Sequence, residues 1–353
     1  MREIVAMFLA TRIALLATVL TAVASLPPAA VAVTVSSVPL LNALAQWDGA
    51  AYLYIAQHGY GGENYTNYTA YFPLYPALMR LGGALLGGSD DAALISGVLV
   101  ANASTVAALA ALLRLGSHER RTLVTAGVYI LVFPTTIFLS AVYADALFLV
   151  LAIASAVAAE RRAWLPSGGL AAAAALTRPF GGLVVLPLAL ALWQTRTFTP
   201  RAIVAIAGAP LAFAAFVAYL YALTGDPLAV LHGYSSGFTP RGPFQSITDL
   251  FDPTVYGFPW FIGAMLVLSV VLVALTWRLT SLPLAAYATA LLLVIVFAGS
   301  LASSMRYELL LYPMFIALAT IVRGGIPRLV WLLASALVAA VFAAMFALSY
   351  WVG

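Results

Sequence analysis

The chain has 353 residues, of which 64% are hydrophobic and 8% are charged, with a formal net charge of +4. A soluble domain carries about 25% charged residues, so this composition excludes a soluble core and predicts an all-α polytopic membrane protein. The absence of cysteine excludes disulfides, thiolate catalysis and cysteine-based metal sites. All 16 basic residues are arginine. The excess of positive charge lies in short connections, which is typical of a topology signal rather than of a nucleic-acid partner.

Apolar runs bounded by Arg, Pro or Gly predict about eleven membrane spans in a single domain covering residues 1–353. The first run, from Met7 to Leu26, also fits a signal peptide with Ala22-Val23-Ala24 as its cleavage site. Arg12 inside this run favours an uncleaved helix. The predicted spans are 5–26, 91–113, 122–140, 143–160, 164–177, 180–195, 202–223, 259–277, 282–303, 306–322 and 328–350.

Two of these spans, 164–177 and 180–195, are shorter than the roughly 20 residues that a crossing helix needs. They are expected to form a hairpin that spans the membrane incompletely. The segment 71–88 contains Arg80 and four glycines, which favours an interfacial or re-entrant helix.

Arginines in alternate connections predict a cell-membrane protein with a cytoplasmic N-terminus. They are Arg2, Arg114, Arg120, Arg121, Arg161, Arg162, Arg196, Arg201, Arg278, Arg323 and Arg328. With this orientation, the long connections 27–90 and 224–258 face the extracytoplasmic side. The first of these outer loops is expected to contain interfacial helices.

One string in the first outer loop, Trp47-Asp48-Gly49, places a carboxylate in a polar aromatic segment beside the membrane. An ionisable group in so lipophilic a chain is a candidate for chemistry. Asp48 also fits the cap of a helix that begins at Gly49 and ends near His58. Both interpretations stay open, because a cap uses only one carboxylate oxygen.

Further ionisable residues at predicted outer ends of spans are candidates for the same site. Asp145 is at a helix start, where an N-cap is the favoured interpretation. Arg178 and Arg306 lie at helix ends, where arginine commonly extends toward lipid headgroups. One carboxylate and several arginines at a lipid boundary suit a phosphate-bearing lipid and a proton to be removed. The three histidines show no spacing typical of a metal site.

The chain resembles the PIG-V family of mannosyltransferases and their prokaryotic relatives, which belong to the GT-C class of membrane glycosyltransferases. The resemblance covers about residues 5 to 322. It is carried by Gln46-Trp47-Asp48-Gly49 with Tyr54-Ile55-Ala56 and Gly59-Tyr60, Phe72-Pro73-Leu74-Tyr75-Pro76 with Arg80, Val142 to Phe148, Thr177-Arg178-Pro179-Phe180-Gly181, and Arg306-Tyr307 with Leu311-Tyr312-Pro313.

The resemblance implies a GT-C-type bundle and an inverting glycosyltransferase that moves a hexose, most simply mannose, from a polyprenyl-phosphate donor. The acceptor would be a glycolipid or glycan on the extracytoplasmic face. The family's acidic general base maps onto Asp48, and an acidic residue of a later block maps onto Asp145, where this chain has Asp in place of Glu. The family often has Arg where this chain has Gln46. The GPI acceptor on which PIG-V enzymes act is not expected to be the substrate of this chain.

In this hypothesis no metal or other cofactor is needed, because the lipid donor already holds the phosphate. The site residues fall into three groups: Asp48 as the catalytic base; Arg178, Arg306 and Arg241 at the donor phosphate; and Trp47, Tyr52, His58, Tyr71, Asp145 and His232 as substrate-binding or supporting residues. For the loop tyrosines, anchoring at the interface is favoured over stacking on sugar rings. The histidines are more typical of surface or structural positions.

Two alternatives stay open. A lipid-linked sugar flippase would have charge at mid-membrane and an inverted repeat, neither of which is evident in the sequence. A GT-C transferase that uses another sugar, such as arabinose, would have the same sequence features.

Overall fold

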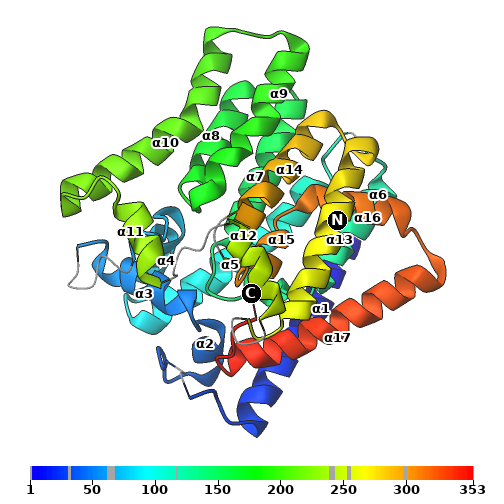
Figure 1. The fold of residues 1–353 in the computed structure, drawn as a ribbon. Helices are drawn as coiled ribbons and strands as arrows, with labels where there is room; N and C mark the ends of the chain where they lie inside the picture. Colours follow the sequence, from blue (N-terminus) through cyan, green and yellow to red (C-terminus); the bar gives the residue numbers. More distant parts are fainter. Residues whose placement is uncertain are drawn as a thin grey trace. The chain divides into compact units, whose positions relative to one another are not determined.

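The computed structural model describes residues 2–30, 33–61, 68–116, 118–237, 243–252, 256–297 and 300–352. These residues form helices and connecting turns, with no strand among them, as the sequence predicted (Figure 1). The chain divides into two compact units by its internal contacts. Unit 1 comprises Met1–Pro28, Leu109–Ile137 and Pro240–Gly353, and unit 2 comprises Ala29–Ala108 and Phe138–Thr239.

Unit 1 contains the first and the last helices of the chain. Its elements are α1 (Arg2–Ser25), α6 (Arg120–Val132), α12 (Pro243–Thr248), η4 (Asp249–Phe251), α13 (Pro259–Leu279), α14 (Leu282–Phe297), α15 (Ser304–Glu308), α16 (Tyr312–Ile321) and α17 (Gly325–Ala347).

Unit 2 contains the predicted outer loop and the helices that follow it. Its elements are α2 (Pro39–Leu44), α3 (Asp48–His58), α4 (Leu74–Leu85), most of α5 (Asp90–Leu112), α7 (Asp145–Glu160), α8 (Trp164–Ala175), η3 (Pro179–Val184), α9 (Val185–Thr195), α10 (Pro200–Thr224) and α11 (Ala229–Gly237). The short helix η2 (Thr136–Leu139) lies where the units meet in the sequence.

Five helices of the described chain are long and apolar enough to cross a membrane, namely α1, α5, α10, α13 and α17. Shorter apolar helices lie at Pro179–Thr195, Leu282–Phe297 and Tyr312–Ile321. This set is consistent with a multi-pass membrane protein, while the number of about eleven crossings stays a prediction. The 12-residue helix α4 is too short to cross, and its exposed Leu81 and Leu85 suit an interfacial position.

Two predicted spans are interrupted in the structure. The helix expected over 122–140 ends at Val132, because Pro134 disfavours helical backbone at Phe133. The span expected over 306–322 is divided into α15 and α16, and Pro313 occupies the first turn of α16. A proline at this position starts a helix but cannot continue one.

Arg12 of α1 binds the interrupted end of α6. Its guanidinium donates to Leu131 O at 3.0 Å, to Thr136 O at 3.1 Å and to Thr136 Oγ1 at 2.7 Å, and the residue is 4% exposed. The last carbonyls of a helix have no partner within it, so this buried arginine replaces the missing hydrogen bonds. The sequence located Arg12 inside a span but did not predict this role.

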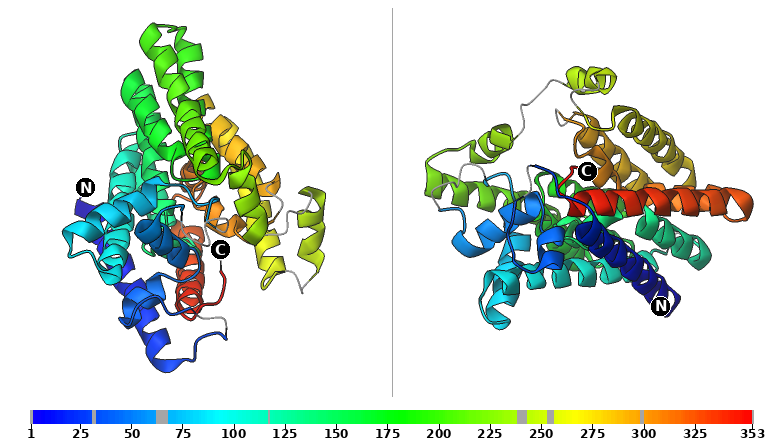
Figure 2. Two further views of the ribbon diagram at one scale, coloured as in Figure 1. Left: turned by 90° about the vertical axis from the view of Figure 1, so that its left-hand side faces the viewer. Right: turned by 90° about the horizontal axis from the view of Figure 1, so that it is seen from below.

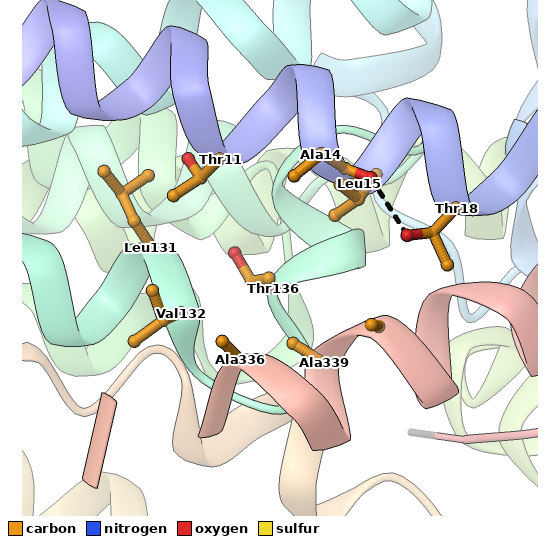
Figure 3. A pocket seen from close by; sticks show the side chains of 10 residues that line it. Thr11, Ala14, Leu15, Thr18, Leu131, Val132, Thr136, Ala336 and Ala339 are labelled. Carbon is orange, nitrogen blue, oxygen red and sulfur yellow. Dashed lines mark hydrogen bonds between the residues drawn. The ribbon is translucent and has the colours of Figure 1, made fainter. Parts of the chain in front are cut away.

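Small side chains leave a hollow of about 100 Å³ beside this contact. Figure 3 shows Thr11, Leu15 and Thr18 of α1 on one side and Ala336 and Ala339 of α17 on the other. Helices α1 and α17 lie side by side in unit 1, as the view from below in Figure 2 also shows.

In unit 2, α8 and α10 pack at very short range. A side chain on Gly168 of α8 would overlap the backbone of Ala205 in α10, so only glycine permits this approach. The predicted hairpin of 164–177 and 180–195 is present as α8 followed by η3 and α9, which lie together in Figure 1. Small residues at helix contacts are typical of membrane proteins.

Candidate active site at the start of α3

Asp48 is the first residue of α3, and it does not cap that helix. The N-cap position is occupied by Trp47, and no side chain makes a cap hydrogen bond there. The capping interpretation of Asp48 is therefore wrong, although the predicted end of the helix at His58-Gly59 is confirmed. The half-buried Asp48 carboxylate accepts a hydrogen bond from the Tyr71 hydroxyl at 3.2 Å.

The turn before Asp48 has an unusual backbone. Trp47 has φ 57° and ψ −117°, a conformation that residues other than glycine rarely adopt. The buried hydroxyl of Tyr143 bridges the turn by donating to Gln46 O and accepting from the Asp48 N–H, both at 3.1 Å. The sequence did not identify Tyr143 as a site residue, although it is in one of the blocks that carry the family resemblance.

Tyr52 connects this turn to other segments of unit 2. It is 3% exposed, and its ring packs edge-on against Tyr71, Tyr75 and Tyr143, with centroids 5.4, 5.0 and 6.4 Å away. The predicted interfacial anchoring is therefore wrong for Tyr52, which belongs to the protein interior. Burial, with smaller contributions from Tyr52 and the Asp145 carboxylate, raises the pKa of Tyr75 well above its usual value.

Asp145 and Arg178 form a buried ion pair. Asp145 begins α7 and is fully buried, and its carboxylate accepts a hydrogen bond from the Arg178 guanidinium. The residue before it, Ala144, takes the N-cap position, so the N-cap interpretation of Asp145 is wrong. Arg178 is 4% exposed and does not extend to the surface, which also contradicts the headgroup interpretation.

Backbone hydrogen bonds join these segments. Val142 N donates to Leu44 O at 2.8 Å, which connects the end of α2 to the segment that contains Tyr143. Leu74 N donates to Leu176 O at 2.9 Å, which connects the start of α4 to the turn that contains Arg178. Asp48, Tyr71, Tyr143 and the Asp145–Arg178 pair thus belong to one connected part of unit 2.

The two candidate histidines are elsewhere in unit 2. His58 ends α3, about 15 Å along the helix axis from Asp48, and its ring stacks on Tyr54 with centroids 4.6 Å apart. His232 of α11 is exposed and contacts Asp226 at 2.6 Å. The hydrogen bond from His232 holds the pKa of Asp226 below its usual range. These contacts are local, and a substrate-binding or supporting role for either histidine stays a prediction.

Arg306 belongs to unit 1. It is 3% exposed, donates to the Tyr307 hydroxyl at 3.0 Å, and its guanidinium carbon lies 4.9 and 5.4 Å from the ring centroids of Tyr307 and Trp351. The headgroup interpretation is wrong here too, because the side chain is inside unit 1. Arg241 lies outside the described residues.

Comparisons with known proteins match this chain to one protein family. A family model described as Mannosyltransferase (PIG-V) matches residues 2–220. The chain is 34% identical over 156 residues to GPI alpha-1,6-mannosyltransferase 2 of Mus musculus, a match that covers 42% of this chain and 31% of the relative. The protein of the same name from Rattus norvegicus is 33% identical over 151 residues, covering 40% of this chain and 30% of the relative.

The matched stretch spans about a third of the length of these curated relatives. Asp48, Tyr71, Tyr143, Asp145 and Arg178 all fall inside the range of the family model. Arg306 and His232 fall outside it.

Proposed function

Because this chain belongs to the PIG-V family of mannosyltransferases, we propose that it transfers mannose from a polyprenyl-phosphate donor to a glycolipid or glycan acceptor. The transfer takes place on the extracytoplasmic face of the cell membrane, within a GT-C-type bundle of about eleven crossings. Donor and acceptor are lipid-borne or membrane-proximal, which fits the apolar helices of both units.

The geometry at Asp48 is the observation on which this proposal rests most. Aspartate is among the preferred N-cap residues, but Trp47 occupies that position in α3. The Asp48 carboxylate is held instead by the Tyr71 hydroxyl. A half-buried carboxylate oriented by a hydroxyl donor suits a general base.

In the proposed reaction, Asp48 removes the proton from the acceptor hydroxyl as its oxygen attacks the anomeric carbon of the donor sugar. The bond between that carbon and the phosphate oxygen breaks, and its electron pair leaves with the phosphate. A single displacement inverts the anomeric configuration, so one essential carboxylate is sufficient, whereas glycoside hydrolases use a pair. General base catalysis of this kind contributes roughly 10²–10⁴-fold to the rate.

Arginine neutralises the charge that develops on the leaving phosphate. Of the three arginines that the sequence predicted for this role, Arg178 belongs to the same unit as Asp48. The Asp145 carboxylate offsets the charge of Arg178, so this pair offers an anion less net attraction than an arginine alone. Trp47 is 38% exposed beside Asp48 and is a candidate to contact substrate directly.

The test is transfer by the purified protein from radiolabelled polyprenyl-phosphate mannose to a membrane lipid extract, followed by identification of the labelled product. Asp48→Asn is expected to abolish transfer while the protein still folds. Asp90→Asn is the matched control, because Asp90 is also the first residue of its helix, α5, and is exposed.

Near-normal transfer by Asp48→Asn contradicts the assigned role. Donor movement across vesicle membranes without any labelled product favours the flippase alternative. If label is transferred only from polyprenyl-phosphate arabinose, the donor sugar is arabinose instead of mannose, and the reaction is still glycosyl transfer.

A further inference from the structure

The Tyr143 hydroxyl holds both ends of the turn that precedes the proposed base. Tyr143 is fully buried, and its single oxygen bonds Gln46 O on one side of Trp47 and the Asp48 N–H on the other. The Gln46 side chain is tied down as well, since its amide donates to Asn42 O at 2.8 Å. The turn is therefore fixed by contacts on both sides of Trp47.

The conformation of Trp47 requires such contacts. A residue other than glycine in this region of backbone space is strained and persists only when its surroundings impose it. No glycine stands at position 47, so the strain is present in the folded chain. The Tyr143 hydroxyl supplies such contacts, because it bonds the backbone on both sides of Trp47.

The turn also decides which residue caps α3. With Trp47 in the N-cap position, Asp48 becomes the first helical residue and its carboxylate stays out of the cap. The local sequence favours a different arrangement, in which Asp48 caps a helix that begins at Gly49. In that arrangement the carboxylate would accept hydrogen bonds from the first turn of the helix.

We infer that Tyr143 is a positioning residue of the transfer reaction: by bridging Gln46 and Asp48 it keeps Asp48 at the first helical position, where its carboxylate meets the Tyr71 hydroxyl and serves as the base. This inference rests on the proposed function for the role of Asp48. Tyr143 itself touches no reacting atom and acts through the backbone of Asp48.

The first experiment measures steady-state transfer by Tyr143→Phe, which removes only the hydroxyl. Because small displacements of a catalytic group cost about 10²-fold in rate, kcat is expected to fall about 100-fold. KM for the lipid donor is expected to stay within about twofold, since no substrate contact is lost. Tyr129→Phe is the matched control: Tyr129 is fully buried in unit 1, and its hydroxyl also donates to a backbone carbonyl, Val322 O, at 2.6 Å.

The second experiment measures hydrogen exchange of the Asp48 amide in the wild-type protein and in Tyr143→Phe. The wild-type amide is expected to exchange slowly, at the rate of the α3 interior, and the variant amide about tenfold faster or more. This measurement does not depend on activity, and its wild-type arm does not depend on the folding of the variant.

Unchanged kcat in Tyr143→Phe overturns the inference, and so does a rise in KM alone, which would mark Tyr143 as a substrate contact. Rapid exchange of the wild-type Asp48 amide overturns it as well, even if the variant fails to fold. Absence of transfer by the wild-type protein contradicts the proposed function and the catalytic role together, whereas slow exchange of its Asp48 amide would still support the hydroxyl contact.

Discussion

Arg178 and Asp145 form a buried ion pair that joins the turn before η3 to the first residue of α7. The two residues are 33 positions apart in the sequence, and neither is more than 5% exposed at its side chain. The pair lies in the same connected part of unit 2 as Asp48. It therefore has two separable roles to test: support of the fold and contact with a leaving phosphate.

Removing one partner of this pair leaves the other charged and buried, which typically costs about 3–5 kcal/mol. Arg178→Met and Asp145→Leu are each expected to lower the yield of folded protein. The double variant Asp145→Leu/Arg178→Met is expected to recover folding, because a packed apolar pair avoids the uncompensated charge. Melting temperature and detergent-stable yield are the measurements. Normal transfer by the folded double variant would exclude Arg178 from phosphate binding.

Arg12 is expected to be essential for the stability of unit 1. Arg12→Leu removes the donors to Leu131 O, Thr136 O and Thr136 Oγ1, and each unsatisfied buried group costs about 1–3 kcal/mol. Thermal unfolding of the purified protein should show a large loss of stability. Thr18→Ala is the control in the same helix, since Thr18 bonds Ala14 O of its own helix, and its effect should be small. Equal melting temperatures for both variants would contradict this role.

Adjacent glycines in α8 give a sharp test of the contact with α10. Gly168→Ala is expected to destabilise unit 2, because the new methyl group would overlap the backbone of Ala205. A methyl group on Gly169 would meet no neighbouring atom within 4 Å, so Gly169→Ala should be neutral or slightly stabilising through better helix propensity. Melting temperatures of the two variants should differ by several degrees, and identical values would show that the helices pack less closely than described.

Tyr71 is expected to affect the rate through Asp48. Tyr71→Phe removes the hydroxyl that donates to the carboxylate, a charge-assisted bond worth about 1.5–3 kcal/mol, so kcat should fall about 10- to 100-fold. Tyr68→Phe is the matched control: Tyr68 stacks on Tyr54 with centroids 4.3 Å apart and is also a partly buried tyrosine of this loop. Transfer rates at saturating donor check the prediction, and equal rates for both variants would argue against Tyr71 as the group that orients Asp48.

The helical class and the segments of the site were predictable because they depend on local information. Composition predicted the apolar helices, and the family resemblance indicated Asp48 and the blocks around Tyr71, Asp145 and Arg178 as candidates. Glycine and proline also marked several helix ends correctly, as at Gly59. These features depend on residues that are close together in the chain.

The contacts between the blocks were not predictable, because they join residues that are far apart in the chain. Capping rules favoured N-caps at Asp48 and Asp145, but Tyr143 and Arg178 contact these residues from segments about 95 and 33 positions away. The long-range contacts override the local preference. Likewise, the role of Arg12 depends on where α6 ends, and that end depends on a proline more than 100 residues from Arg12.

The hydrogen bond from Leu74 N to Leu176 O uses backbone atoms only, so no replacement of either side chain other than proline at position 74 removes it. Replacing Leu74 or Leu176 by another apolar residue should therefore keep the turn that contains Arg178 in its place beside the start of α4. An inserted or deleted residue between Tyr71 and Leu74 would instead shift the register of this turn with α4 and move Tyr71 relative to Arg178. The segment between Tyr71 and Leu74 should therefore be more sensitive to insertions and deletions than Leu74 and Leu176 are to substitutions.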